Sequence, residues 1–157
     1  MIFVSVGSQK FQFNRLLKKI DELIENGTIK EKVFAQIGVS DYKPQNFDFI
    51  DFMTQDEFNN MIDKCDLLIT HAGTGVIINA VKREKKVIAT PRLSKYGEHV
   101  DDHQIQLINQ FDELKFIEPL YELDNLDKVI SNIKKKKYKK YVSNTDNIID
   151  SIEAFIG

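Results

Sequence analysis

The chain has 157 residues, a formal net charge of −2 at pH 7 and 42% hydrophobic residues, as expected for one ordinary globular domain spanning residues 1–157. The single cysteine, Cys65, excludes an internal disulfide framework and a cysteine-based metal site. No stretch approaches the roughly 18 apolar residues of a membrane span, and residues 1–9 lack the basic start of a signal peptide. We therefore expect a cytoplasmic protein.

The first half of the chain contains apolar runs of strand length and apolar residues at helical spacing. In chain order these predict a strand at residues 2–6, a helix at 11–24, strands at 33–37 and 47–52, and a helix at 54–64. Asn14 is the expected N-terminal cap of the first helix, and Asn26 with Gly27 its end. Thr54, with Glu57 three residues later, forms a capping box that begins the second helix.

The second half continues this alternation. It predicts a strand at 66–70, a tight turn at 71–75, a helix at 76–85, a strand at 86–90, a polar loop at 92–102, a helix over 105–111, a short strand over 116–119, and helices over 126–133 and 143–156. Asp124 or Asn125 is expected to cap the helix over 126–133. Strands that alternate with helices, without hairpin signals, indicate an α/β fold: a single Rossmann-like domain, with a parallel sheet and helices on both faces.

Ligands of parallel sheets bind at the carboxyl ends of the strands, so the loops after the strands are the candidate sites. Two of these loops contain glycine: Gly7 with Ser8, and the turn His71-Ala72-Gly73-Thr74-Gly75. The second loop opens a helix, whose free amides and positive dipole end favour an anion such as phosphate. Neither loop matches the G-x-G-x-x-G or Walker pattern, which disfavours NAD-type and P-loop sites. An alternative explanation is that these glycines only form the tight turns between a strand and the next helix.

The site hypothesis leads to a substitution test at the second loop. Valine in place of Gly73 or Gly75 is expected to crowd a bound phosphate while leaving the fold intact.

Polar residues converge on the same edge of the predicted sheet. His71 ends one strand, and His103 and Gln104 follow the next. A His-x-x-x-His pair, His99 with His103, is an alternative zinc site if both lie on one helix face, but no third ligand is evident and we expect no metal. Cys65 has no histidine beside it in sequence, so no nucleophile–base pair is indicated.

Six lysines occupy seven positions near the C-terminal end of the chain, at 134–137, 139 and 140. Without them the chain would carry −8. Such a run is compatible with a solvated loop, and also with contact to anionic lipid, which is worth about 1 kcal/mol per lysine near the surface. Nucleic acid is disfavoured because no nucleic-acid motif accompanies the run.

The loop motifs carry a family resemblance. Residues 69–75, with the sequence ITHAGTG, are followed by Pro91 and by Asp-His-Gln at 102–104. This combination resembles the donor-binding, C-terminal half of GT-B glycosyltransferases of family 28. The resemblance is to the Alg13-like group, which is related to the C-terminal domain of MurG and includes subunits of two-component enzymes of exopolysaccharide and capsule biosynthesis. It extends over nearly the whole chain.

The resemblance implies a UDP-sugar donor, as substrate rather than cofactor, and assigns a role to each matching position. Gly7 and Ser8 would face the diphosphate across from the turn at 73–75. Phe52 and Met53 would line the uracil. The complete set of residues implied in substrate binding is Gly7, Ser8, Phe52, Met53, His71, Gly73, Thr74, Gly75, Asn79, His103 and Gln104.

The resemblance also implies particular roles for four of these residues. His103 and Gln104 would reach the sugar or the distal phosphate. Asn79 stands where MurG-like enzymes have a glutamate that binds the ribose, which puts that contact in question because an amide has no charge. The general base usually comes from the acceptor half, which leaves His71 as a secondary catalytic candidate.

A single donor half implies a partner. The resemblance indicates an Alg14-like, membrane-anchored subunit that holds a lipid-linked acceptor and recruits this chain to the inner face of the cell membrane. Residues 143–157 would form the docking helix, and the transferred group would be a hexose or N-acetylhexosamine. The alternatives are a non-catalytic nucleotide-binding or scaffold module and a flavodoxin-like FMN binder.

Overall fold

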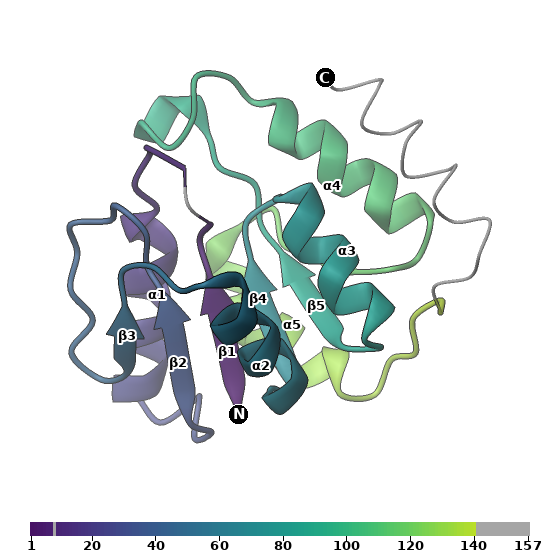
Figure 1. Cartoon of the computed structure of the whole chain (residues 1–157), viewed down its shortest axis with the longest axis horizontal. Coiled ribbons are helices and arrows are strands. Elements are labelled where there is room, and N and C mark those ends of the chain that lie inside the picture. Colours follow the sequence, from purple (N-terminus) through teal and green to yellow (C-terminus); the bar gives the residue numbers. More distant parts are fainter. Residues whose placement is uncertain (8, 141–157) are drawn as a thin grey trace.

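The computed structural model describes residues 1–7 and 9–140, and the predicted helix at 143–156 lies outside them. Its strands form one parallel sheet with the order β3-β2-β1-β4-β5-β6 (Figure 1). The strands are β1 (Ile2–Ser5), β2 (Val33–Gln36), β3 (Asp48–Ile50), β4 (Leu67–Thr70), β5 (Lys86–Ala89) and β6 (Glu118–Pro119). The predicted Rossmann-like parallel sheet is confirmed.

Five α-helices and two short 3₁₀ turns accompany the sheet in the described residues. They are α1 (Asn14–Glu25), α2 (Gln55–Lys64), α3 (Thr74–Lys82), η1 (Ser94–Tyr96), α4 (His103–Glu113), η2 (Leu123–Asn125) and α5 (Leu126–Ile133). Helices α1 and α5 cover one face of the sheet, and α2, α3 and α4 cover the other (Figure 1). None of these helices combines the length and apolar character that a bilayer crossing requires.

The two hydrophobic cores follow from the alternation of side chains along each strand. Ile2 and Val4 of β1 pack with α1 and α5, whereas Phe3 between them packs with α2. In β4 the same division separates Ile69 from Leu68. Because both faces are covered, the central strands are apolar throughout, which is why the sequence showed continuous apolar runs there.

Local signals predicted some helix boundaries correctly and others incorrectly. Thr54 caps α2 by accepting a hydrogen bond from the amide of Glu57, as predicted. Asn14 is not the cap of α1 but its first residue. Its own amide donates to the side chain of Gln12, and its side-chain oxygen accepts from the amide of Tyr42. Asn14 therefore fastens the loop after β2 instead of capping the helix.

Two boundaries near the C-terminal end also differ from the prediction. The last strand is Glu118–Pro119, because Phe116 and Ile117 are buried against α4 after a turn in which Lys115 has a φ of 60°. Asn125 occupies the cap position of α5, but its side chain makes no capping hydrogen bond.

The order of the strands places a crevice between β1 and β4. The chain runs outward from β1 to β2 and β3, then crosses to β4 on the other side of β1. The loops that leave β1 and β4 therefore diverge to opposite sides at the carboxyl edge. Ser5 and Thr70, the last residues of these strands, are register partners at this edge.

Candidate functional site

A pocket of about 310 Å³ lies at this crevice, which is at the lower end of the range of small-molecule sites, roughly 300–1,000 Å³. It is lined by Ser5, Gly7, Gln36, Met53, Gln55, Phe58, Gly75, Val76 and Asn79. Four of these, Gly7, Met53, Gly75 and Asn79, are residues that the sequence analysis assigned to substrate binding. The fold thus brings together predicted positions from two loops, after β1 and β3, and from the helix α3.

The N-terminus of α3 opens onto this pocket. The first backbone amide of α3 that donates a helical hydrogen bond is that of Ile77, whose acceptor is the carbonyl of Gly73. No side chain caps the start of the helix. The amides of Thr74, Gly75 and Val76 are therefore free to donate to a ligand. The helix begins at Thr74 rather than Val76 as predicted, so Gly75 and Val76 both lie in its first turn, against the pocket. The helix dipole adds positive potential there.

Gly75 leaves empty space in front of this helix turn. A Cβ atom built on Gly75 meets no heavy atom within 4 Å among the described residues. Gly73 is different, because its Cβ would come within 2.7 Å of Nε2 of His71. The prediction that valine at Gly73 leaves the fold intact is therefore wrong, because His71 is buried and has no room to move away.

The imidazole of His71 is held between two glycines. Gly7 has a φ of 76°, and its Cβ would lie 2.5 Å from the same Nε2 atom. Any larger residue at Gly7 or Gly73 would collide with the ring. The same contact thus explains why both loops need glycine: the backbones at Gly7 and Gly73 both approach Nε2 of His71 closely.

Hydrogen bonds fix the protonation of His71. Its Nδ1 lies 3.4 Å from Nε of Arg92 and 3.3 Å from Nε2 of Gln104. An arginine N–H can only donate, so Nδ1 accepts and the ring proton lies on Nε2. Burial, with a smaller effect from the charge of Arg92, lowers the pKa of His71 to about 3. The ring is therefore neutral near pH 7 and presents an N–H between the two glycines.

This arrangement argues against His71 as a general base. Its Nδ1 is occupied, and its Nε2 carries the proton already. The ring is 2% exposed and is not among the lining residues of the pocket, so donation from its Nε2–H to an anion stays a prediction.

Arg92 is the hub of the loops around the site. Its side chain is fully buried and donates to the carbonyls of Val6, Phe11, Gln12 and Glu98. Burial lowers the pKa of Arg92 to about 10, partly offset by the charge of Glu98, so the guanidinium stays charged at neutral pH. The loop after β1 is thereby tied to the loop after β5.

Glu98 supplies the balancing charge. It is also fully buried, and Arg15 of α1 binds both its carboxylate oxygens at 3.0 Å. The sequence analysis missed Arg92 and Glu98, because charged residues in a polar loop are exposed by default. The only sequence signal was the position of Arg92 directly after Pro91, at the carboxyl edge of the sheet.

Gln104 holds the loops rather than lining the pocket. Its Oε1 accepts from the amides of Ala72 and Arg92, and its Nε2 contacts His71. The side chain is buried, with 6% exposure. Its position favours an indirect role, fixing the turn before α3, and contact between Gln104 and a sugar stays a prediction.

Asn79 lines the pocket within a polar network that joins α3 to α2. Its Nδ2 donates to Asn59, and its Oδ1 accepts from Nε of Arg83. Arg83 is in turn paired with Asp63. The amide is therefore oriented by a cation, and one hydrogen and one lone pair remain for a ligand. Ribose binding by Asn79 stays a prediction.

Gln36 is, with Ser5 and Gln55, one of the polar lining residues that were not predicted from the sequence. It ends β2, beside Ser5 of β1, and is 6% exposed. Its Oε1 is buried and has no hydrogen-bond partner among the described residues. A buried carboxamide oxygen without a partner is costly, so we predict that Gln36 contacts a bound ligand.

Two of the remaining predicted residues, Phe52 and His103, are exposed and do not line the pocket. Phe52 is 49% exposed beside the lining residue Met53. His103 is exposed at the start of α4, with Nδ1 3.5 Å from Asp101. Ser8 lies outside the described residues.

The possible zinc pair is not arranged as that alternative required. His99 precedes α4, so it shares no helix face with His103. Among residues 1–7 and 9–140, no three histidine, cysteine or acidic side chains cluster as metal ligands.

A parallel sheet with a pocket and an uncapped helix start at its switch point defines a Rossmann-like class of domain. Within this class the chain belongs to the glycosyltransferase family 28 C-terminal domain, which matches residues 1–155. The family predicted from the ITHAGTG segment is thus confirmed.

One curated relative and two solved structures illustrate the similarity. The UDP-N-acetylglucosamine transferase subunit ALG13 of Candida albicans is 25% identical over 151 residues, which are 93% of this chain and 50% of the relative. The NMR structure of ALG13 has a TM-score of 0.61 at 19% identity, over 97% of this chain and 96% of that one. MurG of Acinetobacter baumannii has a TM-score of 0.60 at 15% identity, over 98% and 49%.

The coverage and the sequence identities limit what these similarities establish for this chain. The chain spans about half the length of the curated relative that it matches. At 19% and 15% identity, the two structures establish the shared fold alone.

Proposed function

We propose that this chain is the donor-binding, catalytic subunit of a two-component glycosyltransferase that uses a UDP-sugar. The observation that carries the proposal is the pocket at the β1–β4 crevice, where the free amides of α3 begin. Nucleotide sugars present a diphosphate between two rings, and the pocket offers an anion site flanked by space on the side of Met53 and Asn79. The family membership of the chain supports this assignment.

The chemistry that this site would assist is departure of UDP. In the transfer, the bond between the anomeric carbon and the β-phosphate oxygen breaks, and an acceptor oxygen bonds to that carbon. Negative charge develops on the leaving diphosphate, where the amides of Thr74 and Gly75 and the Nε2–H of His71 can stabilise it. Because these donors are fixed before the reaction, little reorganisation is needed.

The acceptor side is proposed to come from another chain. The curated relative is named as a transferase subunit, and this chain contains one α/β unit in its described residues. We assign to an Alg14-like, membrane-anchored partner the lipid-linked acceptor, the general base and the recruitment of this chain to the inner face of the membrane. The transferred group would be a hexose or N-acetylhexosamine, in exopolysaccharide or capsule synthesis.

The experiment is co-expression of the chain with an Alg14-like protein, followed by assay of membranes with radiolabelled UDP-glucose, UDP-galactose and UDP-N-acetylglucosamine. One donor should label a lipid product only when both chains are present. The matched control is the same pair with Gly75→Val, which should lose labelling while both chains still accumulate. Absence of transfer from every donor, with both chains folded, contradicts the proposal.

A non-catalytic nucleotide-binding module is the second candidate. The observation in its favour is that Asn79 has no carboxylate and that His71 has its ring proton on Nε2. UDP binding by calorimetry without any transfer in the co-expression assay would support this candidate instead.

A further inference from the structure

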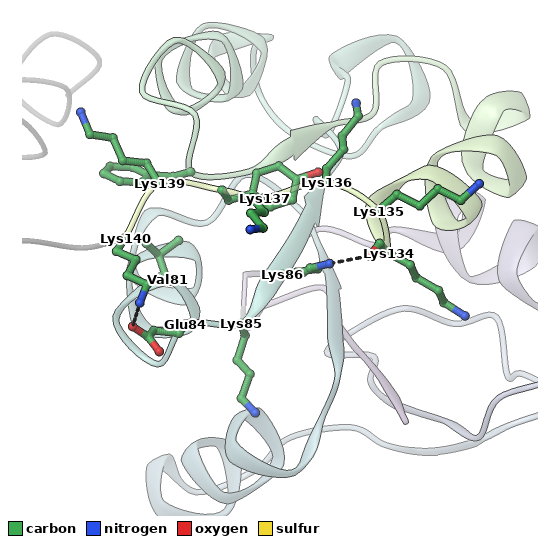
Figure 2. Close-up of a pocket in the computed structure, with 12 residues that line it drawn as sticks. Val81, Glu84, Lys85, Lys86, Lys134, Lys135, Lys136, Lys137, Lys139 and Lys140 are labelled. Carbon is green, nitrogen blue, oxygen red and sulfur yellow. Dashed lines mark hydrogen bonds and ion pairs between the residues drawn. The ribbon is translucent and has the colours of Figure 1, made fainter.

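A second pocket, of about 410 Å³, lies at the opposite, amino edge of the sheet (Figure 2). We call it the lysine groove, and it is lined by Val81, Glu84, Lys85, Lys86, Phe116, Lys134, Lys135, Lys136, Lys137, Tyr138, Lys139 and Lys140. Parts of the chain that are far apart in sequence form it: residues 81–86, from the end of α3 to the start of β5, Phe116, and residues 134–140 after α5. The lysine run is therefore part of a formed surface.

Several contacts fix the lysine run in place. Lys86 donates from Nζ to the carbonyls of Ile133 and Lys134. Further along, the amide of Lys139 donates to the carbonyl of Lys115, and the hydroxyl of Tyr138 to Glu118. These bonds hold the segment against the sheet and the end of α4, although the run makes no helix of its own.

Charge is strongly segregated between the lysine groove and the rest of the molecule. The lining contains eight lysines and one glutamate, for a net charge of +7. Since the whole chain carries −2, the remainder carries −9. Neutralisation within the fold is partial: Lys134 pairs with Glu31, Lys136 with Glu118 and Lys140 with Glu84.

Three ammonium groups remain available. Lys135, Lys137 and Lys139 are exposed, and none has an acidic partner or side-chain hydrogen bond within residues 1–7 and 9–140. Figure 2 shows the lysine side chains fanning out from the segment in different directions instead of converging on one point. This arrangement fits an extended array of anions better than a single bound ion.

We propose that the lysine groove binds directly to an anionic lipid bilayer, without need of a partner chain. Anionic headgroups offer many charges at one surface, and clusters of four to eight basic residues are typical of such contacts. Nucleic acid fits less well, because the groove contains no arginine and the hydroxyl of Tyr138 is bound to Glu118. The proposal does not depend on the donor site.

The lysine groove and the donor pocket lie at opposite edges of the sheet, so the groove could contact a bilayer without covering the pocket. The strands are four residues long at the centre, so roughly 13 Å of sheet separates the lysine groove from the edge that carries the donor pocket. Contact through the groove would leave the donor pocket uncovered and close to the headgroups.

The test is sedimentation of the full chain with vesicles of phosphatidylcholine, alone or with one third phosphatidylglycerol. The wild type should bind only the anionic vesicles, and less as salt rises. The variant Lys135→Gln/Lys137→Gln/Lys139→Gln should bind at least about tenfold more weakly. A matched control, Lys18→Gln/Lys43→Gln/Lys95→Gln, removes the same charge from exposed positions outside the groove and should keep binding.

UDP calorimetry and thermal melting of every variant separate this proposal from the donor-site proposal and from misfolding. The groove variant should keep the melting temperature and UDP affinity of the wild type. Equal binding to neutral and anionic vesicles would overturn the proposal, as would equal loss in both triple variants. Tighter binding to a single-stranded RNA than to anionic vesicles would also overturn it.

Discussion

Nε of Arg92 lies 3.4 Å from Nδ1 of His71, and both side chains are buried. Two basic groups face each other here, and the contact is favourable only because the imidazole is neutral and accepts the hydrogen bond. One contact therefore sets both the orientation of the ring and the atom that carries its proton. The carboxyl edge of the sheet gains a fixed N–H donor between Gly7 and Gly73.

Gly75 provides the cleanest test of the donor pocket. Gly75→Ala should lower UDP affinity about tenfold or more, since the methyl group enters space that the phosphate would occupy. The same change should keep or raise thermal stability, by up to about 1 kcal/mol, because alanine favours a helix over glycine. Calorimetry with UDP and a thermal melt measure the two effects. Unchanged UDP affinity would place the anion elsewhere.

Alanine at Gly7, unlike alanine at Gly75, should destabilise the fold. Gly7→Ala combines a φ of 76° with a Cβ 2.5 Å from His71, so we expect a loss of about 1–3 kcal/mol in the free energy of unfolding. The double variant Gly7→Ala/His71→Ala should recover part of the clash energy, which a double-mutant cycle in urea would measure. Strictly additive losses would show that the ring is not the obstacle.

The neutral state of His71 makes stability depend on pH. Its pKa is about 3 in the folded chain and near 6.5 when unfolded, so the unfolded chain takes up the proton first as pH falls. This contribution to stability is complete above pH 6.5 and declines between pH 6.5 and 3, by about 2 kcal/mol at pH 5.

The variant His71→Gln isolates this effect. Its urea unfolding free energy should fall less steeply with acidification than that of the wild type, whatever its stability at neutral pH. Parallel pH profiles for the two proteins would contradict the assignment. The comparison of slopes removes contributions from carboxylates such as Asp21, whose pKa is lowered by hydrogen bonds from Tyr42, Gln45 and Asn46 despite burial.

Arg92 should be intolerant of substitution. Arg92→Met leaves the carbonyls of Val6, Phe11 and Gln12 without their donor, and a loss of about 3–5 kcal/mol is expected. Arg92→Lys should restore little, since one ammonium lacks the planar fork that reaches both loops. Urea unfolding provides the measurement, with Arg83→Lys as a control at a half-buried position. Near-wild-type stability of Arg92→Lys would refute the hub role.

Substitution of Gln36 should weaken UDP binding without lowering the stability of the fold. Gln36→Leu removes a buried oxygen that lacks a partner, so the free energy of unfolding should stay the same or rise. UDP affinity should nevertheless fall about fivefold to tenfold if the carboxamide serves the ligand. A parallel loss of stability and affinity would instead assign Gln36 a structural role.

Sequence patterns predicted the sheet because both of its faces are buried and its strands are apolar throughout. The cap at Thr54 was predictable because donor and acceptor are three residues apart. Asn14 was mispredicted because Gln12 and Tyr42 compete for its groups, and Tyr42 is distant in sequence. The glycine-bearing turn could be located, but its dependence on His71 and Arg92 required the packing of three loops.

The bonds of Arg92 have a consequence for how the site opens. Because one guanidinium joins residues 6–12 to residues 92–98, neither loop can leave the domain while the other stays closed. The described amides of the two segments should therefore exchange their hydrogens slowly and as one cooperative unit, although both segments lie outside the sheet and the α-helices. We therefore expect the loops after β1 and β5 to behave as one rigid unit and not to open independently.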